Sequence, residues 1–186
     1  RNRERIGQAI HGRLLRMIGH RITHLLRANT RSGSRRNIEG HYDLGNDFYA
    51  LWLDPSMTYS AAMFASAGEP LRDGQLRKYR RIIGQLDVKP GQTILEIGCG
   101  WGGFAEVAAT EFGCRVLGIT LSPSQLAFAR ARAEKGGYGE QVDFELCDYR
   151  DVRGQYDHVV SIEMIEAVGE RFWPTYFAQL SARLKP

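Results

Sequence analysis

Short apolar runs alternate with helical patterns through the second half of the chain. The runs consist mainly of Val, Ile, Leu and aromatic residues, whereas the longer segments between them repeat apolar positions at helical spacing. Such an alternation predicts an α/β fold with a doubly wound, mostly parallel sheet, whose ligand site lies at the carboxyl ends of the strands. The predicted strands are 93–99, 114–121, 142–149 and 156–165, and the predicted helices are 102–112, 123–135 and about 170–184.

The same patterns divide the chain into three regions. Residues 1–36 are predicted to contain an amphipathic helix over 5–27, in which arginines and histidines lie between the apolar positions. Residues 37–90 are aromatic-rich, end with a helix over 71–86 and are expected to form a helical cap on the substrate side. Residues 91–186 carry the sheet and end on "LKP", a turn that normally leads into another strand. We therefore expect the C-terminal strands of the sheet to be missing from this chain.

Charge is distributed unequally between these regions. Residues 1–36 hold ten arginines and one acidic residue, Glu4, whereas the rest of the chain holds more acidic than basic residues. A basic front of this kind indicates an anionic partner. From the pattern alone, an ordinary amphipathic helix packed on protein is favoured over a helix on an anionic membrane surface. We expect neither a secretory signal nor a spanning helix, since no apolar run approaches roughly 18 residues.

The cysteines are Cys99, Cys114 and Cys147, which are widely spaced and form no CxxC pair. This spacing predicts reduced thiols in a cytoplasmic protein and provides neither a disulfide framework nor a metal site. Cys99 and Cys147 are expected near the ligand site, but because no general base is expected beside them, we assign these two thiols no catalytic role.

The sequence "LEIGCGWGG" (95–103) follows the first predicted strand and contains the pattern GxGxxG. Dinucleotide-binding folds use such a turn, but they also need an acidic residue at the end of the second strand to bind a ribose hydroxyl. Here that strand ends "GITLSPSQ" (118–125), with no acidic residue and no arginine for a 2′-phosphate. The pattern therefore disfavours NAD and NADP.

Glu96 lies two residues before the first glycine of this turn. A carboxylate at that position suits S-adenosylmethionine (SAM), which carries a sulfonium and an ammonium group and no pyrophosphate. The alternative is that Glu96 caps the adjacent helix or pairs with a lysine.

Six motifs in order resemble the cyclopropane-fatty-acyl-phospholipid synthases and the related fatty-acid C-methyltransferases. The resemblance extends from about residue 35 to the end of the chain and rests on "HYDLGNDFY" (41–49), "LDPSMTYS" (53–60), "LEIGCGWGG" (95–103), "GITLSPSQ" (118–125), "CDYRD" (147–151) and "SIEMIEAVGE" (161–170). It implies a Rossmann-like class I methyltransferase that uses SAM to methylate an unsaturated acyl chain of a membrane phospholipid.

The resemblance also implies which residues bind the cofactor. Tyr59 and Ser60 would contact its methionine end, and Gly98 and Gly100 would form the floor beneath it. The ribose and adenine side would be bound by the neutral residues Thr120, Leu121 and Gln125. Asp148 and Tyr149 would flank the adenine.

The product depends on where the proton is lost after methyl transfer to the alkene. In ring-forming members a bound bicarbonate is thought to accept it, held by a Cys, a Glu, a His and a Tyr. Glu166 matches that Glu, but Ala61 stands in place of the Cys, and Ala167 follows the Glu where ring-forming members often have His. These differences put bicarbonate in doubt and favour a methylated or methylenated product over a cyclopropane ring.

Several further residues have two interpretations each. Glu166 follows the fourth predicted strand, a usual place for a catalytic group, but it is also placed to cap the next helix. His41 is predicted either to orient substrate or donate to Glu166, or to be a packed histidine that binds a main-chain carbonyl. Glu163 is a weaker catalytic candidate. Among the aromatic residues, only Tyr59 is expected to stabilise a cationic cofactor or intermediate by a cation–π contact. The others are expected to lie in the core, namely Phe48, Tyr49, Trp52 and Phe64. Trp101 either shields the cofactor or packs on the following helix.

The resemblance changes the interpretation of the basic helix. An enzyme that acts on acyl chains in a bilayer needs an interfacial contact, and Arg13, Arg16 and Arg21 would supply it by binding lipid phosphates. The protein is then expected to be cytoplasmic and peripheral at the inner membrane surface, with an oligomer possible. Nucleic-acid binding is disfavoured because the segment lacks interleaved aromatic residues. A non-catalytic SAM- or lipid-binding module is the alternative from another class.

Overall fold

The computed structural model describes residue 33 and residues 45–186. The predicted helix over 5–27, including Arg13, Arg16 and Arg21, and the candidate His41 lie outside the described residues. The elements along the rest of the chain are α4 (Gly45–Ala50), α5 (Leu71–Leu86), β1 (Thr93–Ile97), α6 (Gly103–Phe112), β2 (Arg115–Thr120), α7 (Pro123–Gly136), β3 (Val142–Leu146), β4 (His158–Val160), α8 (Ile165–Val168), the 3₁₀ helix η1 (Glu170–Phe172) and α9 (Trp173–Arg183).

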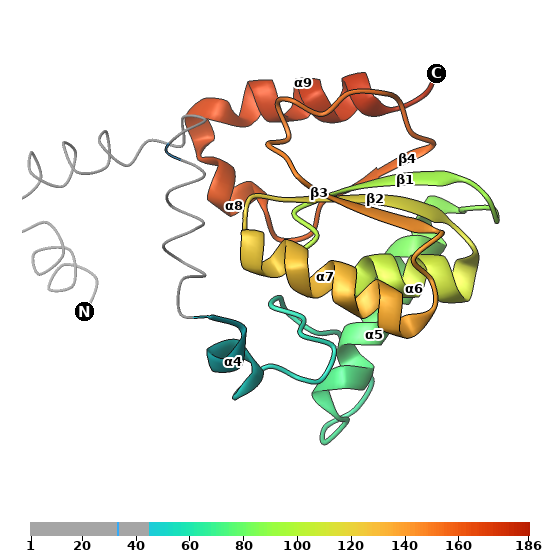
Figure 1. The fold of residues 1–186 in the computed structure, drawn as a ribbon, viewed down its shortest axis with the longest axis vertical. Coiled ribbons are helices and arrows are strands. Elements are labelled where there is room, and N and C mark those ends of the chain that lie inside the picture. The colour runs from blue at the N-terminus through green and yellow to red at the C-terminus, as the bar shows by residue number, and fades with distance from the viewer. Residues whose placement is uncertain (1–32, 34–44) are drawn as a thin grey trace, which may run out of the picture.

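The four strands form one parallel sheet in the order β3-β2-β1-β4 (Figure 1). The chain builds outward from β1 to β3 and then returns to the other side of β1 to add β4. The reversal creates a switch point between β1 and its neighbours, which is where open α/β sheets bind ligands. The predicted α/β, doubly wound, Rossmann-like sheet is confirmed.

Alternate residues of β1 face opposite layers of the molecule. Ile94 packs with residues of α5, α6 and α7, including Ile83, Phe104 and Ala129. Leu95 and Ile97 instead belong to a second cluster that contains residues of α8 and α9 (Figure 1). Because both faces of the strand are covered, all but one of its buried residues are apolar. Glu96 is the exception, and it is buried on the side of Ile94.

The local signals explain where the helices begin and end. Ser122 caps α7 by accepting a hydrogen bond from the Gln125 amide at 3.3 Å, and Pro123 occupies its first turn. Gly113 and Gly137, which follow α6 and α7, adopt left-handed conformations with φ of 65° and 73°. These caps match the helix boundaries predicted from the pattern to within about two residues.

The fourth strand is much shorter than the predicted 156–165. Only His158–Val160 pairs with β1, because beyond it the Ser161 hydroxyl, rather than a main-chain amide, donates to the Ile97 carbonyl at 3.1 Å. The chain then leaves the sheet and forms α8, which the pattern did not predict. After α9, Leu184 forms a parallel bridge with Tyr156, so the chain returns beside the start of β4.

Candidate functional site

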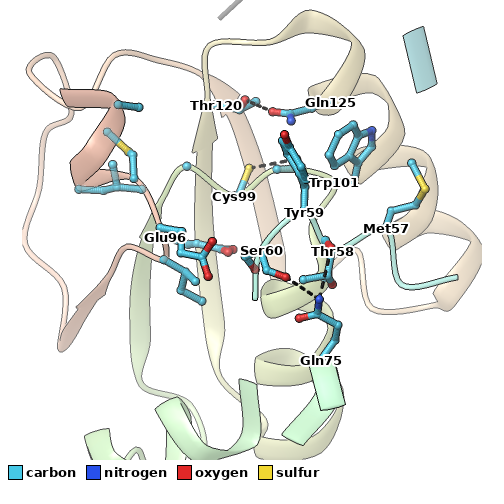
Figure 2. Close-up of a pocket in the computed structure, with 18 of the residues that line it drawn as sticks. Met57, Thr58, Tyr59, Ser60, Gln75, Glu96, Cys99, Trp101, Thr120 and Gln125 are labelled. Carbon is cyan, nitrogen blue, oxygen red and sulfur yellow. Dashed lines mark hydrogen bonds between the residues drawn. The ribbon is translucent and has the colours of Figure 1, made fainter. Parts of the chain in front are cut away.

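A cavity of about 880 Å³ lies at the carboxyl ends of β1, β2 and β4 (Figure 2). It occupies the switch point of the sheet, and the segment 52–61 and part of α5 complete its walls. Most of the residues predicted to bind the cofactor or act in catalysis line this one cavity, namely Tyr59, Ser60, Glu96, Gly98, Gly100, Thr120, Leu121, Gln125, Tyr149 and Glu166.

The glycine turn after β1 is tied to the neighbouring strand by its main chain. The amides of Gly98 and Cys99 both donate to the Ile119 carbonyl, at 2.9 and 3.0 Å. Gly98 has a φ of 83°, and a Cβ there would lie 3.2 Å from the Met164 sulfur. At Gly100, with a φ of 53°, a Cβ would meet nothing within 4 Å. The first glycine is therefore required by conformation and packing, whereas the second leaves open space beside the cavity.

Glu96 presents a buried carboxyl group to the cavity. The residue is 4% exposed, and its Oε2 atom has no hydrogen-bond partner among the described residues. It does not cap α6, which begins after Gly102 and has no side-chain cap. Burial raises the pKa of Glu96 from its usual value near 4.5 to about 8, although Arg132 opposes the shift. A cationic ligand would reverse this shift because it favours the ionised form.

At the end of β2 the cavity wall is made of neutral polar groups. The Thr120 hydroxyl donates to Gln125 Oε1 at 2.8 Å and accepts from the Ser122 amide at 3.1 Å (Figure 2). Thr120 and Gln125 are both buried, and Leu121 lines the cavity between them. This wall offers hydrogen bonds without a formal charge, as expected for a site that does not use an acidic residue to bind a ribose.

The two residues predicted to flank an adenine are placed differently. Tyr149 lines the cavity, and its ring packs edge-on against Tyr176 with centroids 5.3 Å apart. Asp148 is not among the lining residues. Its carboxylate binds the Arg150 guanidinium at 2.7 and 2.6 Å, so it orders the loop that carries Tyr149.

Sequence reasoning did not identify the residues that hold the wall segment 54–61 against the rest of the protein. On α5, Gln75 and Lys78 are nearly fully buried, although both are polar. Gln75 Nε2 donates to the Ser60 carbonyl at 2.7 Å, and Lys78 Nζ contacts the Ser60 hydroxyl (Figure 2 shows Gln75 beneath Ser60 and Thr58). A usable signal existed, because these polar residues lie three positions apart on the inward face of a predicted amphipathic helix.

The same segment is held by a further residue of α5 and by one of α7. The buried Tyr79 hydroxyl donates to the Thr58 hydroxyl oxygen at 3.0 Å, and Thr58 pairs with Ser56 at 2.7 Å. From α7, Arg132 donates to the Ser56 carbonyl at 2.6 Å and also binds Glu106. The wall is therefore held mainly by side chains.

The loop after β4 brings two carboxyl groups to the cavity. Glu163 has a φ of 48°, which is unusual for a residue other than glycine, and its Oε1 accepts from the Ala61 amide at 2.7 Å. Glu166, in α8, lines the same cavity, as does Ala61. The candidate catalytic Glu166 thus lies with Glu163 and Ala61 around one space.

The aromatic residues beside the cavity are only partly core. Tyr49 and Trp101 are buried, their rings lie 5.1 Å apart, and Trp101 Nε1 donates to the Asn46 side chain at 2.7 Å. Trp101 therefore packs against α4 as well as lining the cavity. The expectation that the others lie in the core is wrong for three of them, because the exposed residues include Phe48, Trp52 and Phe64. Tyr59, 44% exposed, lines the cavity and packs between Tyr49 and Trp52.

The surroundings of the two cysteine thiols at the cavity disfavour their reactive, ionised form. Cys99 and Cys147 line the cavity, but burial raises the pKa of both thiols, so they stay protonated. Within residue 33 and residues 45–186, no group of three or more potential metal ligands comes together, and no helix there has the length and apolar character to cross a membrane.

Comparison with known proteins places these motifs in a family. The family model described as "Mycolic acid cyclopropane synthetase" matches residues 29–186. Tuberculostearic acid methyltransferase UfaA1 of Mycobacterium tuberculosis is 47% identical over 85% of this chain and 38% of its own length. The Escherichia coli K12 cyclopropane-fatty-acyl-phospholipid synthase is 41% identical over 92% of this chain and 43% of its own length. The chain thus spans less than half of the length of these relatives.

A solved structure gives the same result at the level of the fold. Mycolic acid cyclopropane synthase CmaA1, crystallised in complex with SAH and CTAB, aligns with a TM-score of 0.78 and 30% identity, covering 81% of this chain and 53% of that one.

Proposed function

The chain belongs to the mycolic acid cyclopropane synthetase family, and on that premise we propose that it binds SAM and methylates the double bond of an unsaturated fatty acyl chain of a membrane phospholipid. The observation that carries the proposal is the cavity at the switch point, in which a buried carboxyl group has an unpartnered oxygen and the end of β2 offers only neutral groups. Relatives of this chain include a fatty-acid methyltransferase, and a similar structure contains SAH, the demethylated form of SAM.

The residues present fit this cofactor. Glu96 would bind the ammonium or sulfonium charge, which supplies the partner that its buried carboxyl group lacks. Tyr59 and Ser60 would contact the methionine end, and the open side of Gly100 would let the ligand approach the main chain. Thr120, Leu121 and Gln125 would bind the ribose and adenine side, next to Tyr149. When bound, SAM supplies an electrophilic methyl group.

An alkene is a weak nucleophile, so the protein must align it and exclude water. The apolar and aromatic lining of the cavity, with Trp52, Leu53 and Met164 among its residues, suits an acyl chain. Glu166 is the proposed catalytic carboxylate near the proton that the product must lose, with His41 orienting substrate or donating to it.

A methylated or methylenated product is favoured over a ring. Ala61 provides no thiol beside Glu166, where ring-forming members are expected to hold bicarbonate with a Cys. A cyclopropane ring remains the second candidate, because the Escherichia coli relative is named for that reaction.

Lipid mass spectrometry after expression of the full-length protein in a host with unsaturated phospholipids tests this proposal. We expect acyl chains that gain one CH₂ group and still take up hydrogen during mild catalytic hydrogenation, as an alkene does. Resistance to hydrogenation would indicate the ring instead. A Glu166→Gln variant should form roughly 10²-fold less product, the usual scale for losing an acid–base group, while still binding SAM. No new lipid from the wild-type protein would support the non-catalytic module.

We also propose that the protein is peripheral at an anionic membrane surface, through Arg13, Arg16 and Arg21. Sedimentation with vesicles that contain anionic phospholipid should be lost when these three arginines are changed to glutamate, and in the wild type it should weaken with salt. Unchanged sedimentation of the charge-reversed variant would contradict this role, and competition by nucleic acid would point to the alternative partner.

A further inference from the structure

Lys78 is an almost fully buried cation beside the proposed cofactor cavity, although it does not line the cavity itself. It is 6% exposed, and its ammonium group has three hydrogen-bond acceptors around it. Nζ donates to the Ala61 carbonyl at 2.9 Å, to Gln75 Oε1 at 2.8 Å and to the Ser60 hydroxyl oxygen. A protonated lysine has three N–H donors, so each donor finds one acceptor.

These contacts determine what the Ser60 hydroxyl can do. Because Lys78 donates to the Ser60 oxygen, the hydroxyl hydrogen of Ser60 is left to donate elsewhere. The Ser60 carbonyl is occupied by Gln75 Nε2 at 2.7 Å. Ser60 lines the cavity, so its hydroxyl group can donate a hydrogen bond to a ligand there. The buried ammonium group of Lys78 contacts the same hydroxyl oxygen.

Glu163 holds the next residue from the opposite side. Its carboxylate accepts from the Ala61 amide at 2.7 Å, while Lys78 donates to the Ala61 carbonyl at 2.9 Å. The amide and the carbonyl of Ala61 are therefore bound by groups of opposite charge. The carboxylate comes from Glu163 in the loop after β4, and the ammonium group comes from Lys78 on α5. Glu163 adopts a left-handed φ of 48° in making this contact, a conformation that costs energy for a residue with a Cβ.

We propose that Lys78, assisted by Glu163, is a positioning residue that orients Ser60 to donate to the carboxylate of the amino-acid end of SAM. The inference rests on the proposed function and deepens it. It assigns a separate binding partner to each of the two charged groups, ammonium and carboxylate, at the amino-acid end of SAM. Glu96 receives the ammonium group, and the Lys78–Ser60 pair receives the carboxylate.

Isothermal titration with SAM and with decarboxylated SAM tests this assignment, because the second ligand keeps the sulfonium and amine but has no carboxylate. We expect the Lys78→Met variant to bind SAM about 10- to 100-fold more weakly, the scale of a lost charge-assisted hydrogen bond. Its affinity for decarboxylated SAM should change by less than about threefold. Lys78→Arg, which keeps the charge, should recover part of the SAM affinity. Lys89→Met, a change in an exposed lysine that pairs with Asp87, is the matched control and should bind both ligands like the wild type.

Ser60→Ala provides a second variant that does not remove a buried charge. It should reproduce the selective loss of SAM affinity even if Lys78→Met fails to fold. Equal weakening for both ligands in the folded variants, or no weakening for either, would overturn the positioning role while leaving the proposed function intact. If the wild-type protein binds neither ligand, the proposed function itself fails and the positioning role fails with it.

SAM affinity measured as a function of pH provides a further test. A lysine with a purely structural role would not make this affinity depend on its own protonation. Burial lowers the pKa of Lys78 from its usual 10.5 to about 8, even though Glu163 and Asp54 favour the charged form. The titratable Tyr79 also lies against Lys78, with its ring centroid 4.9 Å from Nζ. The ratio of SAM affinities between Lys78→Arg and the wild type cancels the titration of the ligand and of Glu96. We expect this ratio to rise as the pH increases through about 8. A constant ratio would contradict a role for the charge.

Discussion

On the sheet side of the cavity, the turn after β1 is held by main-chain hydrogen bonds to β2, whereas the wall 54–61 is held by side chains from α5, α7 and the loop after β4. The turn depends on the pairing of β1 with β2, because the amides of Gly98 and Cys99 both donate to the Ile119 carbonyl of the adjacent strand. The wall needs Lys78, Arg132 and Glu163, each of which is distant from it in sequence. One side of the site is thus part of the sheet, and the other is attached to it by polar contacts.

This difference predicts different consequences of mutation. Changes in the turn distort the main chain on which a ligand lies and should affect binding most. Changes in the wall remove buried hydrogen bonds and should affect stability together with the position of Tyr59 and Ser60.

The largest expected effect comes from Gly98→Ala. The new Cβ would lie 3.2 Å from the Met164 sulfur at a φ of 83°, so both the conformation and the packing of the turn oppose it. We expect SAM affinity to fall by about 100-fold and the free energy of unfolding to fall by about 1–2 kcal/mol. Gly137→Ala is the matched control, because that glycine also has a left-handed φ, of 73°, but has open space around it at the end of α7. It should lose stability through its conformation alone and should lose no affinity, and equal binding losses in the two variants would contradict the comparison.

Glu96→Gln should separate binding from stability. Because burial raises the pKa of Glu96 to about 8, the folded protein retains a proton that the unfolded chain releases near 4.5. The contribution of Glu96 to the free energy of unfolding therefore falls as the pH rises from about 4.5 to about 8, with a slope of up to about 1.4 kcal/mol per pH unit, and it levels off above that window. In Glu96→Gln the side chain does not titrate, so this pH-dependent fall in the free energy of unfolding is absent.

Urea unfolding at several pH values measures the effect. Relative to the wild type, Glu96→Gln should gain stability across this window, while its SAM affinity at neutral pH falls by roughly tenfold, as for one lost charged contact. Glu134→Gln, on an exposed position of α7, should follow the wild type in both measurements. A pH-independent difference between Glu96→Gln and the wild type would mean that Glu96 is ionised in the empty site.

The smallest effect on SAM affinity is expected from Thr58→Val, which tests how the wall is held. The Thr58 hydroxyl bonds to both Tyr79 and Ser56 in a buried position, so its removal leaves two polar groups without this partner. The free energy of unfolding should fall by about 1–3 kcal/mol. Thr110→Val is the control, since that hydroxyl is exposed and donates only to the Glu106 carbonyl of its own helix. Thermal or urea unfolding of both variants provides the measurement, and equal losses would argue against a wall anchored by buried polar contacts.

Prediction from sequence was most successful where structure is local. The apolar runs and the helical spacing between them predicted the sheet and the helices that cover it. The ten candidate residues that line the cavity were mostly implied by the resemblance of short motifs to a family, and Glu96 was also predicted from its position before the glycine turn. Prediction from sequence failed at β4, where a side-chain hydrogen bond from Ser161 ends the strand early. It also failed for Phe48, Trp52 and Phe64, because an aromatic pattern does not reveal whether another element covers it.

The sequence by itself determined the class of fold, the position of the ligand turn and the neutral character of the β2 end, since these depend on residues that are neighbours in the chain. Only the tertiary structure decided that Arg132 binds the Ser56 carbonyl, and that Lys78 and Glu163 meet at Ala61. Glu163 lies 102 positions from Ala61. Contacts over such a separation depend on how the layers pack around the switch point, because burial there, rather than any local pattern, forces each polar group to find a specific partner.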